Sequence, residues 1–236
     1  MKTTLKGYLI STLLLILWVN VQGQNKDNYD WMPVPKEWQS NSSKFILDSD
    51  FTVAIQGYEG IALQNYATGF LRRLDWKTGL FFKQKAVIIA DRSHLLINVQ
   101  RKGKLVLGED ESYTLAVTDK NIQIKAETDF GAMRALETLL QLLHSGNSNY
   151  FFPGIEVQDS PRFPWRGLMI DVSRHFQPLE VIKRNLDGMA AVKLNVLHLH
   201  LVDDHGFRVE SKIFPQLHEK ASDGQYFTQI EIKEII

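Results

Sequence analysis

The stretch that decides the fold covers residues 166–207 and reads RGLMIDVSRHFQPLEVIKRNLDGMAAVKLNVLHLHLVDDHGF. Two short apolar runs, 167–172 and 194–202, have the length and composition of buried strands. Between them, apolar residues recur at helical spacing behind Pro178, which suits the first turn of a helix. Strand, helix and strand with short joints predict a right-handed βαβ unit with parallel strands.

Ionisable side chains follow both predicted strands. The carboxyl ends of neighbouring parallel strands meet at one edge of the sheet, where such folds carry their chemistry. The residues that gather there are Asp171, Arg174, His175, Asp203, Asp204 and His205. A structural loop rarely needs so many ionisable groups, so we expect a functional site at this edge.

The composition excludes several classes of protein. The 236 residues suffice for one large or two ordinary domains. Since 27 basic residues balance 27 acidic ones, no overall field attracts nucleic acid, and we predict no nucleic-acid partner. The absence of cysteine excludes disulfides, thiolate metal sites and a cysteine nucleophile.

The start of the chain has the pattern of a secretory signal. Lys2 and Lys6 precede an apolar core over residues 8–19. Small residues then precede a plausible cut after Gly23, and the core is shorter than the roughly 20 residues that span a membrane. We therefore predict a signal peptide over residues 1–23, export to the periplasm or the medium, and no membrane association after cleavage. An uncleaved membrane anchor is the alternative.

Residues 24–160 are predicted to form an α+β domain. Helices are expected over 61–74 and 129–144, where apolar residues keep helical spacing. Strands are expected at 45–47, 51–55, 86–90, 95–99, 113–118 and 122–126, the last two forming a hairpin. We expect one mostly antiparallel sheet, after an extended leading segment that ends at Trp38. The three prolines of 151–165 then indicate a passage to the next domain.

Residues 161–236 are predicted to form a second domain, which opens with the βαβ unit. Beyond the site, 209–217 is predicted to be a loop with a buried Phe214. Thr228 and Glu231 form a capping box, which predicts a helix start. This helix has no stop signal, and two parallel strands cannot close a barrel. We therefore expect the sequence to be part of a longer protein.

A metal site is the first of three interpretations of the charged cluster. His198 and His200 lie on one face of a strand, as in metal-dependent barrel hydrolases. Asp203 and Asp204, close behind, could complete the ligands, although Arg174 would repel the cation.

A sugar site is the second interpretation. Arg174 presents a planar fork of donors to vicinal hydroxyls, and Asp203 offers a carboxylate acceptor. The third interpretation is structural, with Asp171 or Asp203 paired only to fix the strand ends. Its arginine would be Arg166 or Arg174, and the histidines would be core residues. Arg174 and Asp203 are the strongest candidates for direct contact with a ligand.

Two motifs in this region resemble those of a known family. The first is Arg166-Gly167-x-x-x-Asp171-x-Ser173-Arg174-His175. The second, at a matching spacing, is Lys193-Leu194-Asn195-x-Leu197-His198-x-His200-Leu201-x-Asp203-Asp204. Together they resemble the start of the barrel in family-20 glycoside hydrolases, the β-N-acetylhexosaminidases. The resemblance extends forwards to Phe214-Pro215-x-Leu217 and covers most of the chain after the signal.

The resemblance implies a fold and a reaction. The fold would be a small α+β domain, an antiparallel sheet with helices on one face, followed by the first βα units of a truncated (β/α)8 barrel. The reaction would be exo-hydrolysis of terminal β-linked N-acetylglucosamine or N-acetylgalactosamine from oligosaccharides or glycans, with retention. The substrate's own acetamido oxygen attacks the anomeric carbon, so the enzyme needs no nucleophile, no metal and no other cofactor.

The resemblance also implies roles for the candidate residues. Arg174 would bind hydroxyls at the non-reducing end, and Asp203 would lie at the floor of the pocket. His200 and Asp204 would support them, while His205 replaces a common glutamine and receives no role. The family's catalytic Asp-Glu pair lies on a later strand, so we expect no catalytic residue in this chain and no activity of the chain alone. The alternative is a non-catalytic carbohydrate-binding protein that ends where this sequence ends.

Overall fold

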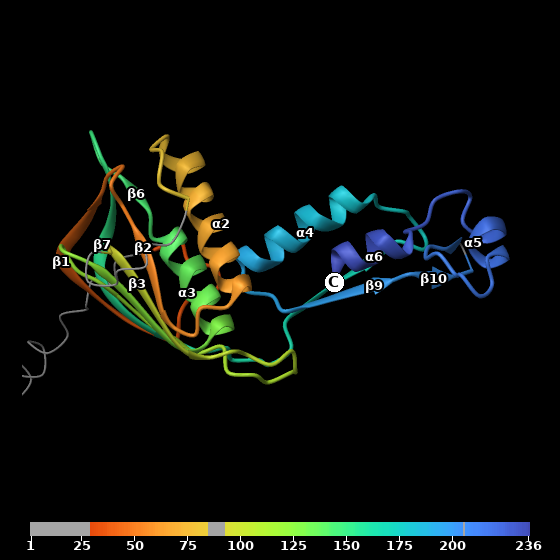
Figure 1. Cartoon of the computed structure of the whole chain (residues 1–236), viewed down its shortest axis with the longest axis horizontal. Helices are drawn as coiled ribbons and strands as arrows, with labels where there is room; N and C mark the ends of the chain where they lie inside the picture. Colours follow the sequence, from red (N-terminus) through yellow and green to blue (C-terminus); the bar gives the residue numbers. More distant parts are fainter. Residues whose placement is uncertain (1–28, 85–92, 205) are drawn as a thin grey trace, which may run out of the picture.

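The computed structural model describes residues 29–84, 93–204 and 206–236. A sheet domain, which we define as residues 29–159, is followed by an elongated barrel part, residues 167–236 (Figure 1). The predicted signal peptide, the predicted strand at 86–90 and His205 lie outside the described residues. Within the described ranges, no helix has the length and apolar character needed to cross a membrane.

One sheet of seven strands forms the sheet domain. Its order is β1 (Glu37–Leu47), β7 (Tyr150–Asp159), β4 (Tyr113–Val117), β5 (Ile122–Thr128), β3 (Leu95–Arg101) and β2 (Val53–Gly57), with the short β6 (His144–Ser145) beside β7. The pairs from β1 to β5 are antiparallel, whereas β5, β3 and β2 run parallel. The α+β class and the mostly antiparallel sheet are confirmed, and the exceptions are the parallel pairs β5–β3 and β3–β2. Strands β2 and β3 are parallel because the crossover helix between them returns the chain to the same end of the sheet.

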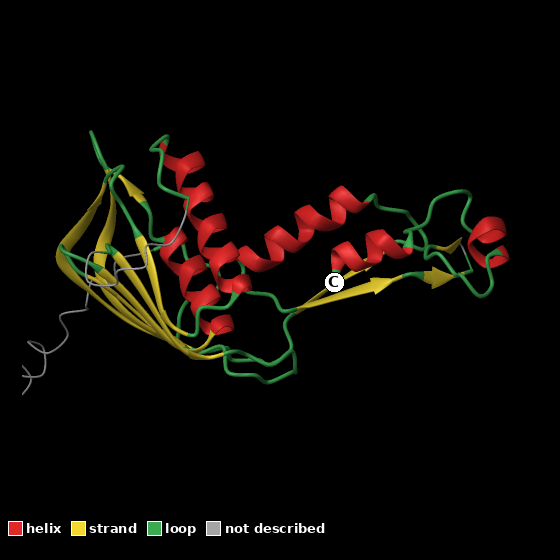
Figure 2. Ribbon diagram, viewed as in Figure 1, coloured by secondary structure: helices red, strands yellow, loops and turns green. Residues whose placement is uncertain are grey.

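Two helices cover one face of this sheet (Figure 2). They are α2 (Ile61–Thr78) and α3 (Asp129–Gln141), close to the predicted ranges. Their inward side chains and the strands form one continuous apolar core, which includes Phe70, Leu136 and Phe152, each without solvent exposure. The period-two alternation of strands leaves the other face polar. In one row across it, the paired residues are Glu37, Gln158, Thr114, Lys125, Asn98 and Gln56.

Strand β7 corrects the predicted passage between domains. The segment 151–165 belongs to the sheet as far as Asp159, between β1 and β4. Pro153, which argued against a strand, pairs with Lys44, where the register of β1 shifts. A bulge of this kind tolerates a residue without a backbone N–H, so the proline interrupts no regular ladder. Strand β1 also begins at Glu37, inside the extended leading segment predicted to reach Trp38 before the sheet starts.

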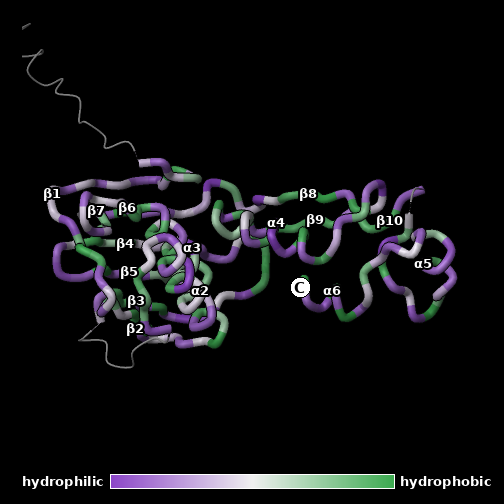
Figure 3. The backbone as a smooth tube through the Cα atoms, turned by 90° about the horizontal axis from the view of Figure 1, so that it is seen from above, coloured by the Kyte–Doolittle hydropathy of each residue, from purple (hydrophilic) through white to green (hydrophobic). Residues whose placement is uncertain are grey.

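The barrel part begins with the predicted βαβ unit. Strand β8 (Gly167–Asp171), helix α4 (Leu179–Ala191) and strand β9 (Val196–His200) follow one another, and β8 and β9 pair in parallel, as predicted. Figure 3 shows apolar residues in both strands, and in β9 these alternate with His198 and His200. Their faces are nevertheless only half buried, and Met169 is 57% exposed.

The remaining elements are short. They are the hairpin β10 (Val202–Asp203) and β11 (Gly206–Phe207) and the helices α5 (Gln216–Ala221) and α6 (Gln229–Ile235). The capping box of Thr228 and Glu231 is confirmed at the start of α6. The prediction of a buried Phe214 is wrong, since its side chain is 65% exposed. The small local core, made of Val172, Ile182 and Phe227, does not include it.

Candidate functional site

The predicted charged cluster lies at the carboxyl ends of β8 and β9. Asp171 is the last residue of β8 and is paired in register with His200, the last residue of β9. Beyond the strands, the backbone N–H groups of Val172 and Ser173 both donate to the carbonyl oxygen of His200. The two chain segments that carry the cluster are therefore joined by backbone contacts.

Arg174 links the two strand ends. Its Nη1 donates to Asp171 Oδ2 at 2.7 Å, and its Nη2 donates to Asp203 Oδ2 at 3.0 Å. The backbone N–H of Arg174 also donates to Asp171 Oδ1 at 3.0 Å, which fixes the turn after β8. The Arg174 side chain remains 61% exposed, so its other N–H groups face solvent. This is a fixed fork of donors, open to a ligand.

Asp203 is a carboxylate with three donors around it. Asp204 N donates to Oδ1 at 2.8 Å, and His200 Nε2 lies 3.0 Å from Oδ2, the atom that Arg174 also contacts. The backbone N–H of Asp204, the His200 imidazole and the Arg174 charge lower the pKa of Asp203 to about 2. Asp171 has a lowered pKa for a similar reason, first the backbone N–H and then the guanidinium of Arg174. Both groups are therefore acceptors at neutral pH.

The structure brings Arg174, Asp203 and His200 together, as the sequence predicts. Asp204 contributes its backbone N–H to the carboxylate of Asp203, and its role as a supporting residue stays a prediction. His198 is exposed on β9. Among the described residues, no group of three or more His, Asp or Glu side chains is arranged to hold a metal ion.

Arg166 does not join this cluster. Its Nη2 donates to Glu111 of the sheet domain at 2.6 Å, while Nε donates to the carbonyl of Lys193 at 2.8 Å and Nη1 to that of Phe163. The hypothesis that Arg166 pairs with Asp171 or Asp203 is therefore wrong. A motif residue that precedes β8 lies at the opposite end of the strand from the charged cluster, and its partner is in the other domain.

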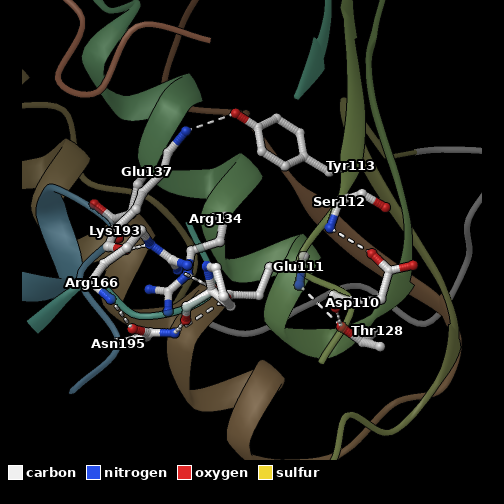
Figure 4. A network of polar contacts seen from close by, with 12 residues as sticks. Asp110, Glu111, Ser112, Tyr113, Thr128, Arg134, Glu137, Arg166, Lys193 and Asn195 are labelled. Atoms are coloured by element: carbon white, nitrogen blue, oxygen red, sulfur yellow. Dashed lines mark hydrogen bonds and ion pairs between the residues drawn. The ribbon is translucent and has the colours of Figure 1, made fainter. Parts of the chain in front are cut away.

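Glu111 is the centre of an interdomain clamp, which we define as Glu111, Arg134, Arg166, Lys193 and Asn195 with their partners (Figure 4). Its Oε2 accepts from Arg134 at 2.7 Å as well as from Arg166, and Asn195 Nδ2 lies 3.4 Å from Oε1. Burial raises the pKa of Glu111, but the hydrogen bonds and charges of Arg166 and Arg134 outweigh it, so the pKa is lowered. Glu111 is therefore ionised and paired within the domain junction.

Lys193 forms the second half of the clamp. It lies between α4 and β9 with a left-handed backbone, φ 61°, and is 5% exposed. Its Nζ donates to Tyr113 Oη at 2.8 Å and to Asp159 Oδ2 at 3.0 Å. Burial lowers the pKa of Lys193, and Asp159 offsets only part of that effect. The clamp was not predicted, because no local pattern joins residues so far apart in the chain.

Comparison with known proteins places both parts of the chain in one group. Residues 31–142 match the family described as "beta-acetyl hexosaminidase like", and residues 163–236 match "Glycosyl hydrolase family 20, catalytic domain". Beta-hexosaminidase 1 of Arabidopsis thaliana is 34% identical over 88% of this chain and 42% of its own length. Beta-hexosaminidase subunit alpha of Bos taurus is 43% identical over 55% of this chain and 25% of its own length.

Solved structures agree with these relatives. Flavobacterium johnsoniae chitobiase aligns with 90% of this chain and 33% of its own, with a TM-score of 0.86 and 47% identity. The exo beta-N-acetylglucosaminidase of Vibrio harveyi, solved with N-acetylglucosamine, aligns with 87% of this chain and 33% of its own, with a TM-score of 0.70 and 30% identity. The chain thus spans between a quarter and about two fifths of the length of these proteins.

Proposed function

Because the chain belongs to glycosyl hydrolase family 20, we propose that it works as part of a β-N-acetylhexosaminidase that removes terminal β-linked N-acetylglucosamine or N-acetylgalactosamine with retention. The sheet domain and the first strands of a (β/α)8 barrel would be its share of that enzyme. The family resemblance supplies the reaction, in which the acetamido group of the substrate acts as nucleophile. No described residue is assigned the role of general acid.

The observation that carries the proposal is the bridge that Arg174 makes between Asp171 and Asp203 at the carboxyl ends of the strands. A guanidinium held on both sides keeps one orientation, so its remaining N–H groups can meet two neighbouring hydroxyls without further ordering. Asp203 can accept from a third hydroxyl. One cation between two carboxylates also disfavours acidic sugars, because a ligand carboxylate would be repelled. A neutral terminal sugar fits this charge pattern.

We also propose where this enzyme acts, which is outside the cytoplasm. The basic residues and apolar core at the start of the sequence support export, and removal of residues 1–23 would leave the enzyme free in the periplasm or the medium. Substrates there would be oligosaccharides or glycans that end in N-acetylhexosamine. The N-acetylglucosamine bound by the Vibrio harveyi relative supports this class of ligand.

A titration of the 236-residue chain with N-acetylglucosamine, followed by NMR, tests the proposal. We expect the Arg174 and His200 signals to shift in wild type, in buffer that contains a chelator. Arg174→Lys should weaken binding about tenfold, since it loses a charge-assisted hydrogen bond worth roughly 1.5 kcal/mol. Arg72→Lys, an exposed arginine of α2, is the matched control. Binding that needs a metal, or that Arg174→Lys leaves unchanged, would contradict the proposal.

A further inference from the structure

Arg208 is a buried arginine that neither motif includes. It follows β11, and 5% of its surface is exposed. Its Nε and Nη2 donate to the carbonyl of Ser173 at 3.2 and 3.1 Å, and Nη1 donates to the carbonyls of Ser222 and, at 3.2 Å, Gln225. One guanidinium therefore connects three segments: the turn after β8, the hairpin β10–β11 and the connection between α5 and α6.

Gly206 shows how closely the guanidinium packs on the hairpin. A Cβ at this position would lie 2.5 Å from Arg208 Nε and 2.6 Å from Cζ, closer than real contacts allow. The Gly206 carbonyl in turn accepts from Ser173 Oγ at 2.9 Å. Ser173, which has no solvent exposure, is thus held through both its hydroxyl and its carbonyl.

These contacts lie on both sides of the candidate sugar site. Ser173 directly precedes Arg174, and Gly206 is the register partner of Asp203 in the hairpin. Ser173, to which Arg208 donates, therefore neighbours Arg174 in the chain, and Gly206, against which Arg208 packs, is paired with Asp203 in register. Removing a guanidinium from water is costly, and an apolar side chain would serve simple packing better. Its retention at this place points to a geometric role.

We propose that Arg208 is a positioning residue that sets Arg174 against Asp203. By fixing the turn after β8 against the hairpin, it determines the separation of the donor fork and the carboxylate acceptor. The consequence for sugar binding rests on the proposed function, whereas the consequence for the Arg174–Asp203 bridge does not.

The test uses the 236-residue chain and two variants that disturb the contact from opposite sides. Arg208→Met removes every donor but keeps an unbranched stem, and Gly206→Ala displaces the guanidinium while Arg208 remains. Arg208→Lys, which keeps the charge and some donors, measures rescue. The matched controls lie on α4: Arg184→Met at an exposed arginine, and Gly188→Ala, where a Cβ meets nothing within 4 Å.

The first readout is the NMR signal of the Arg174 Nε–H and of the His200 ring, measured without sugar. We expect both to move in Arg208→Met and Gly206→Ala, to move less in Arg208→Lys, and to stay in place in the controls. Amide signals of α2 in the sheet domain and of β9 in the barrel part report whether both parts of each variant are folded. A folded Arg208→Met or Gly206→Ala chain with unchanged Arg174 and His200 signals would overturn the proposal.

The second readout is the dissociation constant for N-acetylglucosamine. We expect about a tenfold increase in Arg208→Met, since a misplacement on the order of 1 Å can change the function of a site up to 100-fold. If the wild-type chain binds no sugar but the Arg174 signals still move, the proposed function fails and the positioning role stands. If wild type and Arg208→Met bind equally well, the positioning role fails instead.

Discussion

In the sheet domain, two helices bury one face of a seven-stranded sheet in a continuous apolar core, whereas β8 and β9 of the barrel part keep both faces half exposed. Among the described residues of the barrel part, only three apolar side chains are fully buried: Val172, Ile182 in α4, and Phe227 just before α6. The region that carries the candidate site is thus the one with the smaller core.

Because its apolar core is small, the barrel part depends on polar contacts to hold its strands in position, whereas the sheet domain uses apolar packing for this purpose. The clamp at Glu111 and Lys193 holds the amino ends of β8 and β9, and the Arg208 contacts hold the segments after their carboxyl ends. Hydrogen bonds and ion pairs are directional, so they fix geometry more narrowly than apolar contact alone. A site that depends on the separation of two side chains benefits from that kind of support.

The largest expected effect tests whether the two regions are separate units of stability. Phe227→Ala removes the largest side chain of the small core and should cost about 3–5 kcal/mol. We expect hydrogen exchange to accelerate in β8 and β9 while β3 and β5 keep their protection. Phe214→Ala, at an exposed phenylalanine, should change stability by less than about 0.5 kcal/mol. If β3 and β5 lost as much protection from hydrogen exchange as β8 and β9, the two regions would unfold as one cooperative unit, and the proposed difference in stability would be wrong.

The next effect concerns the clamp. Glu111→Gln leaves two guanidinium groups without their counter-charge and should lower the free energy of unfolding by about 2–4 kcal/mol. Glu127→Gln, whose side chain is 46% exposed, is the control and should cost less than about 1 kcal/mol. Urea unfolding followed by fluorescence measures both. A Glu111→Gln chain as stable as its control would mean that the clamp does not hold the barrel strands.

Acidification should remove the same stabilisation. The pKa of Glu111 in the folded chain lies below its unfolded value of about 4.3. A group with a lowered folded pKa stabilises above the unfolded pKa and loses this contribution as the pH falls through the folded pKa. The difference in stability between wild type and Glu111→Gln should therefore be full at pH 7 and shrink below about pH 4. A difference that grows with acid would contradict this assignment.

Two helix caps give a smaller, matched pair of effects. Thr128, the N-cap of α3, is fully buried and also donates to the carbonyl of Asp110 at 2.5 Å, whereas Thr228 caps α6 at the rim of the barrel part. Replacement by alanine should cost about 2 kcal/mol at Thr128 and about 1 kcal/mol at Thr228. Thermal unfolding of the two variants measures the order. A larger loss of stability at Thr228 than at Thr128 would mean that the cap in the barrel part contributes more to stability than the buried cap in the sheet domain.

The smallest effect on stability is expected at the site itself. Arg174→Gln removes exposed ion pairs, which contribute little to stability because water screens them, while it also removes the guanidinium fork proposed to bind the sugar. The Arg174→Gln chain should therefore keep almost the same free energy of unfolding as wild type, although it no longer binds N-acetylglucosamine. A marked loss of stability would mean that the bridge is a structural ion pair, as the third interpretation of the sequence had it.

Local patterns were sufficient to predict much of this fold. The helices, the hairpin, the βαβ unit and the cap at Thr228 each depend on residues within a few positions of one another. The same holds for the site, since strand ends that are adjacent in a βαβ unit bring Arg174 and Asp203 together. Features whose residues are close in the chain, or lie on strands that a βαβ unit makes neighbours, could be predicted.

The remaining features depend on partners far away in the sequence. Strand β7 contains Pro153 and Gly154, and only its neighbours β1 and β4 show that a proline is tolerated there. Arg166 pairs with Glu111 across 55 positions, a choice that no periodicity encodes. Phe214 lies in a predicted loop, and its aromatic character alone does not tell which face of that loop is covered.

The backbone conformation and the polar partners of Lys193 together limit which amino acids this position can accept. Its left-handed backbone favours glycine, which would relieve about 1 kcal/mol of strain, whereas its place beside Asp159 and Tyr113 favours a long cation. No single amino acid satisfies both preferences: glycine has no ammonium group, and every residue that could replace the charge keeps the strained backbone. A saturation library at this position should therefore rank lysine first although its backbone alone would rank it low, a compromise visible only when conformation and charge are considered together.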